Sequence, residues 1–276
     1  MIPFGLKHAV VSSLAAAAMI PSLAHAEDAV RLYAAGSLRP AMLKIGDAFT
    51  RDTGAKVIGT FGASGLLRER IEKGEPAEVF ASADVGHPTA LMAAGRAGPV
   101  VVFARNRLCA LARRGLDVNS DSLLDRLLDP AVKLGTSTPK ADPSGDYAWA
   151  LFGKAEALRP GSSAKLAAKA LQLVGRPDTP APPPGGSLYA EFLQTGRADI
   201  FLTYCTNARE AAQEVASLRI VTIPDALAVG ADYGLTVLNG ASGTGYRFAL
   251  YVLSPAGQRI LADRGFMPVT LPGAGP

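Results

Sequence analysis

Leu32-Tyr-Ala-Ala-Gly-Ser37-Leu38 is an apolar run closed by a Gly-Ser pair, and it predicts a short strand followed by a tight turn. A helix should follow at once, because Met42, Ile45 and Phe49 recur at spacings of three and four residues. Ser37 therefore lies at or just before the first turn of that helix. There the backbone N–H groups have no partner within the helix and the helix dipole is positive. Such a terminus can bind an anion without any charged side chain.

Two further stretches repeat this arrangement of strand, serine and helix. Ile58-Gly-Thr-Phe-Gly-Ala-Ser64-Gly65 ends a second predicted strand directly before a helix, and Asp142-Pro-Ser144-Gly145 is a third candidate. Serine is a preferred N-cap residue in any protein, so each serine taken alone has an equally good structural explanation. The junctions at Ser37 and Ser64 lie close together in the sequence, and as a pair they indicate a shared anion pocket.

The remainder of the chain alternates predicted strands and helices. This alternation predicts an α/β protein whose parallel sheet is covered by helices on both faces. The proline-rich segment 177–186 is predicted as a loop inside a domain rather than a linker, because a helix and a strand follow at once. The predicted strands are 30–34, 55–61, 78–82, 100–104, 108–112, 132–136, 199–203, 218–223 and 233–238, and the predicted helices are 39–53, 66–72, 88–94, 121–128, 145–158, 162–173, 188–195, 208–215, 246–253 and 255–264.

Residues 1–26 have the pattern of a cleaved secretory signal peptide. Lys7 and His8 form a short basic segment, residues 9–20 are apolar, and Ala24-His-Ala26 is a small-x-small cleavage site. The apolar run is too short for a comfortable membrane span, so an uncleaved anchor is the weaker alternative. We therefore expect a soluble periplasmic chain that begins at Glu27.

Composition argues against nucleic-acid binding and against catalysis. The formal net charge of +4 becomes +3 when Lys7 is removed with the signal peptide, whereas nucleic-acid-binding domains carry dense basic stripes. His87 is then the only histidine, which nearly excludes a Ser-His-Asp triad or a zinc site rich in imidazole. The glycine-rich turn 240–245 matches no nucleotide-binding fingerprint. Cys109 and Cys205 fit a disulfide or two buried thiols equally well.

In their order and spacing, several longer motifs resemble the periplasmic molybdate-binding proteins of ABC transporters, which have the type II periplasmic binding fold. The resemblance covers nearly the whole mature chain. Its most specific segments are Tyr33-Ala-Ala-Gly-Ser37-Leu38, Phe61-Gly-Ala-Ser64, the run from Ile71 to Asp84, Asp199-Ile-Phe-Leu-Thr-Tyr204, and the run from Ser254 to Phe266.

The resemblance implies an α/β protein of two lobes that close around one tetrahedral oxyanion, molybdate or tungstate. Each lobe would be a mostly parallel sheet flanked by helices, with two hinge crossovers between the lobes. Lobe one would be residues 27–106 plus 206–276, and lobe two residues 107–205. The protein would work as a monomer without a cofactor and would deliver its ligand to an ABC permease in the inner membrane.

The resemblance also implies a set of five ligand-binding residues. Ser37 and Ser64 of lobe one would contact the oxyanion through hydroxyl and backbone N–H groups. In lobe two, backbone N–H groups at helix starts correspond to Ser144 and, in a looser alignment, to Gly186. Tyr204, at the strand leaving that lobe, would add a hydroxyl donor.

Two positions depart from the family pattern. Ser144 stands where the family more often has a small apolar residue, so the pocket would gain a hydroxyl. Arg39 stands where a neutral polar residue is usual. It either points to solvent from the first helical turn, as arginine mostly does, or reaches the cleft and changes the anion preference.

In the aligned picture, Cys109 and Cys205 sit on the two segments that cross between the lobes. They could be neighbours there, and we predict a disulfide that joins the hinge segments. The alternative is a pair of buried, weakly polar thiols.

Hydroxyl and backbone N–H groups would give a pocket of donors only, which suits an anion with no protons. A phosphate that keeps a proton would bury that proton without an acceptor. The alternatives are a binder of another oxyanion such as sulfate, a ligand sensor that contacts a membrane receptor, and a secreted serine hydrolase. The hydrolase would use Ser64, although Gly62-Ala-Ser-Gly65 lacks the Gly-x-Ser-x-Gly spacing.

Overall fold

A computed structural model describes residue 1 and residues 29–182 and 186–269. The predicted signal peptide, apart from Met1, lies outside the described residues and stays a prediction.

The described strands pair into one continuous array. β1 pairs in parallel with β2 and β3, and β5 pairs in parallel with β6 and β7, whereas β9 and β4 join these two groups through antiparallel pairing. The order is β2 (Val57–Gly62), β1 (Val30–Ala35), β3 (Val79–Ser82), β9 (Gly230–Val237), β4 (Val101–Ala112), β7 (Ile200–Tyr204), β5 (Leu134–Ser137) and β6 (Leu171–Val174), with β8 (Arg219–Val221) and β10 (Met267–Pro268) also paired to β4.

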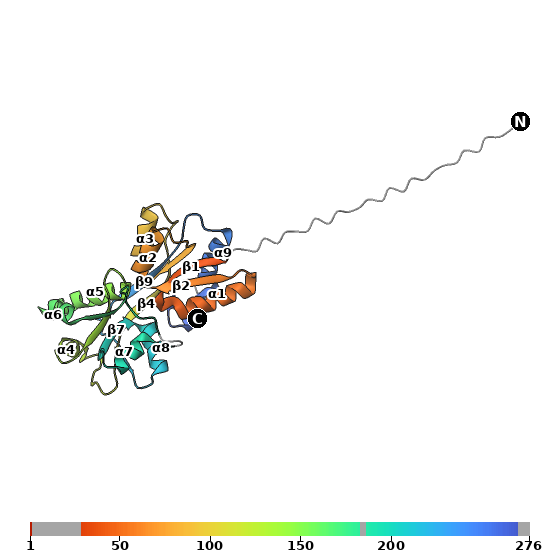
Figure 1. Cartoon of the computed structure of the whole chain (residues 1–276). Helices are drawn as coiled ribbons and strands as arrows, with labels where there is room; N and C mark the ends of the chain where they lie inside the picture. Colours follow the sequence, from red (N-terminus) through yellow and green to blue (C-terminus); the bar gives the residue numbers. More distant parts are fainter. Residues whose placement is uncertain (2–28, 183–185, 270–276) are drawn as a thin grey trace, which may run out of the picture.

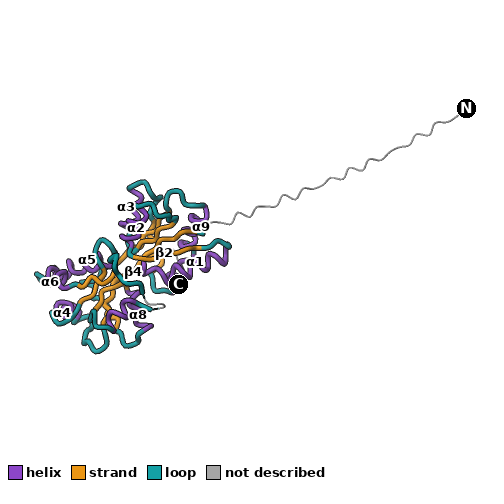
Figure 2. The backbone as a smooth tube through the Cα atoms, viewed as in Figure 1, coloured by secondary structure: helices purple, strands orange, loops and turns teal. Residues whose placement is uncertain are grey.

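Helices cover both parallel groups, so the molecule has two halves (Figures 1 and 2). The predicted two-lobed α/β fold with mostly parallel sheets is confirmed. The first half carries η1 (Gly36–Leu38), α1 (Arg39–Thr53), α2 (Ser64–Glu72), α3 (Gly86–Ala93), α9 (Gly243–Leu253) and α10 (Pro255–Asp263). The second carries α4 (Leu123–Leu128), α5 (Pro143–Leu158), α6 (Ser162–Lys169), α7 (Leu188–Gln194) and α8 (Cys205–Glu214).

Strand β4 passes from one half to the other. Its residues 101–107 pair with β9, and its residues 108–112 pair with β7. The sequence predicted two separate strands here, 100–104 and 108–112, with the segment Arg105-Asn-Arg107 between them. In the structure Asn106 is buried while both arginines are exposed, which is the alternation of a continuous strand.

A disulfide connects β4 to the first residue of α8. Cys109 and Cys205 are bonded, with their Cα atoms 4.9 Å apart, so the predicted disulfide is confirmed. Leu108 lies opposite Tyr204 in the β4–β7 register. The bond therefore holds the end of β7, and Tyr204 with it, against the strand that crosses between the halves.

Helix α8 and strand β8 pack with the second half. Ala208 and Ala211 of α8 share an apolar cluster with Leu111 of β4, and β8 pairs with the same end of β4. The lobe boundaries at 106/107 and 205/206 stay predictions, and this packing favours a return crossing after β8.

Candidate functional site

Ser37 lies in the short helical turn η1, between β1 and α1, and is half-buried. Its hydroxyl shares a 3.0 Å hydrogen bond with the Tyr233 hydroxyl of β9. Asn106 of β4 donates to the same tyrosine oxygen at 3.4 Å and to the Thr206 hydroxyl at 2.9 Å. Ser37 is thereby connected to the strand pair at the centre of the molecule.

Ser64 is the first residue of α2 and is fully buried. Its hydroxyl accepts the Ala83 N–H, from the segment after β3, at 3.1 Å. The next residue, Gly65, donates its N–H to the Ala141 carbonyl of the second half at 2.8 Å. A Cβ atom on Gly65 would lie 2.5 Å from the Lys140 carbonyl oxygen and 2.7 Å from that of Ala141. Glycine is therefore what lets the start of α2 touch the opposite half.

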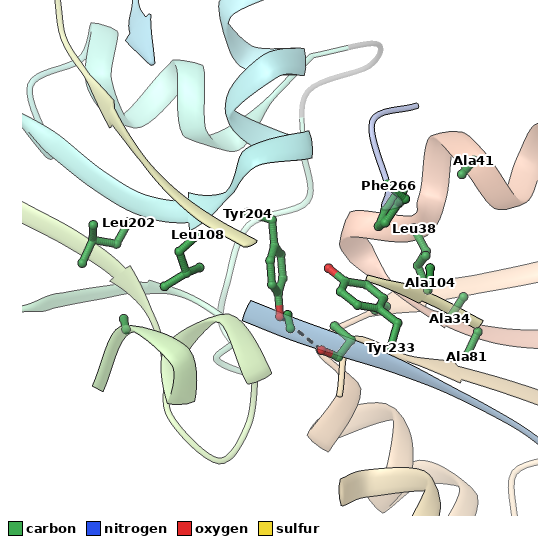
Figure 3. Close-up of a cluster of buried hydrophobic side chains, with 14 of the residues drawn as sticks. Ala34, Leu38, Ala41, Ala81, Ala104, Leu108, Leu202, Tyr204, Tyr233 and Phe266 are labelled. Atoms are coloured by element: carbon green, nitrogen blue, oxygen red, sulfur yellow. Dashed lines mark hydrogen bonds between the residues drawn. The ribbon is translucent and has the colours of Figure 1, made fainter. Parts of the chain in front are cut away.

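Tyr204, at the end of β7, approaches the same place from the second half. Its buried hydroxyl donates to the Ala83 carbonyl at 3.4 Å, and the Tyr147 hydroxyl of α5 donates to that carbonyl at the same distance. The Tyr204 ring also contacts the Tyr233 ring, with centroids 5.5 Å apart. Figure 3 shows Tyr204 and Tyr233 side by side where the halves meet. The structure thus brings Ser37, Ser64 and Tyr204 together around Ala83 and Tyr233.

Burial raises the pKa of Tyr147, Tyr204 and Tyr233 above the usual tyrosine value, because a phenolate would be desolvated there. All three hydroxyls therefore keep their protons at neutral pH. They are neutral hydrogen-bond donors at the contact between the two halves.

Ser144 is the second residue of α5 and is only 1% exposed. Its N–H donates to Asp142 Oδ1 at 3.1 Å, and its hydroxyl has no hydrogen-bond partner among the described residues. Tyr147 lies one turn further along the same helix, so Ser144 belongs to the helix that reaches Ala83. The fourth predicted residue is therefore near the other three.

Asp142 is the N-cap of α5, and sequence reasoning gave it no role in the site. Burial raises its pKa to about 6, and the charges of Asp146 and Asp84 add to this, while the Ser144 N–H and the Ser137 hydroxyl oppose it. With the Ala83 carbonyl, Asp142 puts hydrogen-bond acceptors beside the predicted site. The expectation of a pocket lined by donors only is therefore not met.

Gly186 is half-buried and precedes α7. Its neighbour Ser187 caps α7 and donates its N–H to the Glu214 carboxylate of α8 at 2.7 Å. Within the described segments no hydrogen bond joins Gly186 to the other four predicted residues, and its role stays a prediction.

Arg39, the departure at the start of α1, is exposed and lies over the Phe61 ring of β2, 4.7 Å from its centroid. This position agrees with the interpretation that Arg39 faces solvent.

Among the described residues, no histidine is placed to act as a base for Ser64, which the hydrolase alternative would need. His87 is buried, and its Nε2 lies 4.0 Å from the Asp84 carboxylate. Among the described residues no hydrogen bond connects His87 to Ser64, whose hydroxyl accepts from Ala83. Burial also lowers the His87 pKa.

The described segments contain neither a cluster of metal-binding side chains nor a helix that could span a membrane. No group of three or more His, Cys, Asp or Glu side chains there could hold a metal ion. No helix there is long and apolar enough to cross a bilayer.

A family model for bacterial extracellular solute-binding proteins matches residues 30–267. The chain belongs to that family. An uncharacterized protein of Pasteurella multocida, PM1146, is 37% identical to this solute-binding protein over 240 residues, which are 87% of this chain and 98% of the relative. The molybdate-binding protein ModA of Mycobacterium bovis is 28% identical over 248 residues, or 85% of this chain and 83% of ModA. The solved structure of the sulfate-binding protein SubI of Mycobacterium tuberculosis has a TM-score of 0.74 at 18% identity and covers 88% of each chain.

Proposed function

We propose that this solute-binding protein captures a tetrahedral oxyanion, molybdate or tungstate, in the periplasm and delivers it to an ABC permease in the inner membrane. It acts as a monomer, performs no chemistry on the ligand and needs no cofactor. The signal peptide pattern of residues 1–26 and the extracellular family both support the location.

One observation carries this proposal. Hydroxyl groups from both halves lie close together: Ser64 and Tyr204 are both bonded to the Ala83 backbone, and Ser37 is bonded to Tyr233, whose ring contacts Tyr204. Ser37 and Ser64 stand at the start of helical segments, where backbone N–H groups and the helix dipole favour an anion. The two tyrosine bonds to Ala83 are long, at 3.4 Å, so a stronger acceptor entering between the halves would take these donors.

The energy available from these donors is sufficient for tight binding. Each hydrogen bond to a charged ligand contributes about 1.5–3 kcal/mol net. Five to seven such bonds reach roughly micromolar affinity or better after the costs of association. We assign donors at Ser37, Ser64, Ser144 and Tyr204, with the backbone at Gly186 as a fifth.

The similarity to ModA supports molybdate or tungstate as the ligand. The structural likeness to SubI makes sulfate the second candidate, since sulfate is a smaller tetrahedral dianion with the same acceptor chemistry.

A thermal-shift screen tests the function. The mature chain from Glu27 onward is heated with molybdate, tungstate, sulfate, phosphate or chromate. An anion that binds only the folded state must raise the melting temperature, and we expect molybdate and tungstate to give the largest shifts. If sulfate gives the largest shift, sulfate replaces molybdate and tungstate as the proposed ligand. If no anion gives a shift, the proposal is refuted.

A further inference from the structure

The Asp142 carboxylate occupies the end of α5 that would otherwise bind an anion. It accepts the Ser144 N–H at 3.1 Å, within the first turn of the helix. Burial raises the pKa of Asp142, yet part of the residue remains accessible to solvent. The carbonyl of the preceding residue, Ala141, accepts the Gly65 N–H at the start of α2, so Asp142 lies next to a contact with the other half.

The charged side chains that act on this carboxylate are acidic, and two neutral tyrosines lie near it. Asp84, after β3, and Asp146, on α5, act on Asp142 with their negative charges. Tyr189 of α7 and Tyr204 of β7 are close enough for the charge of Asp142 to raise their pKa values. Asp142 forms no ion pair within the described part of the chain.

The nearby cationic groups act on a different carboxylate. Lys140 and His87 both lower the pKa of Asp146. Since burial lowers the pKa of His87, this imidazole is neutral at pH 7. Neither side chain is therefore placed to neutralise Asp142.

An unused hydroxyl beside the carboxylate points to a ligand at this place. Ser144 Oγ is buried and has no hydrogen-bond partner among the described residues, although the desolvation of such a group is costly. The same residue gives its N–H to Asp142. A ligand oxygen bound by Ser144 would therefore lie next to the carboxylate.

Two negative groups in one such site are stable only if a proton lies between them. We propose that the site binds its oxyanion together with one proton, held between a ligand oxygen and the Asp142 carboxylate. This inference rests on the proposed function. For an anion that carries no proton, such as molybdate, the proton comes from Asp142 where this carboxyl is already protonated and from solvent where it is not, so binding takes up close to one proton per ligand only well above the pKa of Asp142.

The consequence is a steep pH dependence of affinity. The carboxyl group has a raised pKa of about 6 before the ligand binds, so its protonated fraction falls as the pH rises above that value. Only this fraction accepts a dianion, and the dissociation constant for molybdate should increase roughly eightfold between pH 6.5 and pH 7.5.

Calorimetric titration with sodium molybdate, in buffers of different ionisation enthalpy from pH 5.5 to 8, measures both affinity and proton uptake. If molybdate gives no thermal shift, sodium sulfate replaces it. We expect uptake of close to one proton at pH 7.5 for the natural protein. In Asp142→Asn, which keeps an oxygen for the N-cap, we expect no uptake and a dissociation constant that is independent of pH.

Asp178→Asn is the matched control, because Asp178 is an exposed carboxylate paired with Arg176 in the same half. This variant should behave like the natural protein. Binding of molybdate without proton uptake would overturn the inference while leaving the proposed function intact, and so would a natural pH dependence in Asp142→Asn. If Asp142→Asn does not fold, the inference is tested by the proton uptake of the natural protein alone: uptake supports it and no uptake overturns it. Failure of every anion in the thermal-shift screen would instead refute the proposed function.

Discussion

At the scale of single residues, the backbone of Ala83 connects two of the five predicted site residues, Ser64 and Tyr204, with Tyr147. Its N–H donates to Ser64, and its carbonyl accepts from Tyr204 and Tyr147. A small residue without a functional side chain is thus the point where the two halves meet.

Tyr204→Phe tests the contribution of one hydroxyl. The variant keeps the ring contact with Tyr233 but removes a donor, which should cost about 1.5–3 kcal/mol of binding free energy, or roughly a 10- to 150-fold weaker affinity. Isothermal titration with the anion selected by the thermal-shift screen measures this loss. Tyr246→Phe, which changes a half-exposed ring on α9, is the control and should bind normally. Equal affinity in both variants would remove Tyr204 from the site.

The sequence predicted the serines of this site better than its aromatic residues. Ser37 and Ser64 follow strands and precede helices, and such local patterns are visible in one short stretch. Tyr147 and Tyr233 reach the site from α5 and from β9, which lies between β3 and β4 only through long-range pairing. Asp142 looked like an ordinary N-cap, and only its three-dimensional surroundings distinguish it.

At the scale of elements, the start of α2 contacts the loop before α5, where the Gly65 N–H donates to the Ala141 carbonyl. Gly65 at this contact has no room for a Cβ atom. Closure of the two halves therefore depends on a helix that begins with a serine and a glycine.

Gly65→Ala should disturb this contact. The added methyl group would collide with the carbonyl groups of Lys140 and Ala141, at a cost of about 1–3 kcal/mol, so affinity for the selected anion should fall roughly tenfold. Gly153→Ala is the control, because a Cβ atom there meets nothing within 4 Å on an exposed part of α5. It should leave affinity unchanged and raise stability slightly. Unchanged affinity in Gly65→Ala would show that this contact is not needed for binding.

Most element types could be predicted from periodicity, but two details could not. The single strand β4 was predicted as two strands that stop on either side of Asn106. Asn106 can be buried inside a strand because Thr206 and Tyr233 bond to it, and these partners come close only in the folded protein. The helix expected over 162–173 ends at Lys169, and Leu171–Val174 forms β6 beside β5. Pairing with a distant strand decides the structure of that segment, and helical periodicity cannot reveal it.

At the scale of the whole molecule, the bond between Cys109 and Cys205 joins segments that are 96 residues apart in sequence. Closing such a long loop restricts the unfolded chain, so the double variant Cys109→Ser/Cys205→Ser should lose roughly 2–5 kcal/mol of unfolding free energy. Urea denaturation with and without a reductant measures the loss. The reductant should destabilise the natural protein and have no effect on the variant. Equal stability of all four samples would contradict the prediction.

The position of β9 has a consequence for the order in which the molecule can assemble. The strands β1, β2 and β3 come from the first 82 residues, but β9, which seals them to β4, ends only at Val237. In the second half, β4, β5, β6 and β7 are complete once Tyr204 has been synthesised, and α8 and β8 follow before β9. Until β9 has been synthesised, the edge of β3 that pairs with it is unpaired, and an unpaired strand edge promotes aggregation. The strands β1, β2 and β3 must therefore avoid incorrect pairing until β9, one of the last elements of the chain, is available.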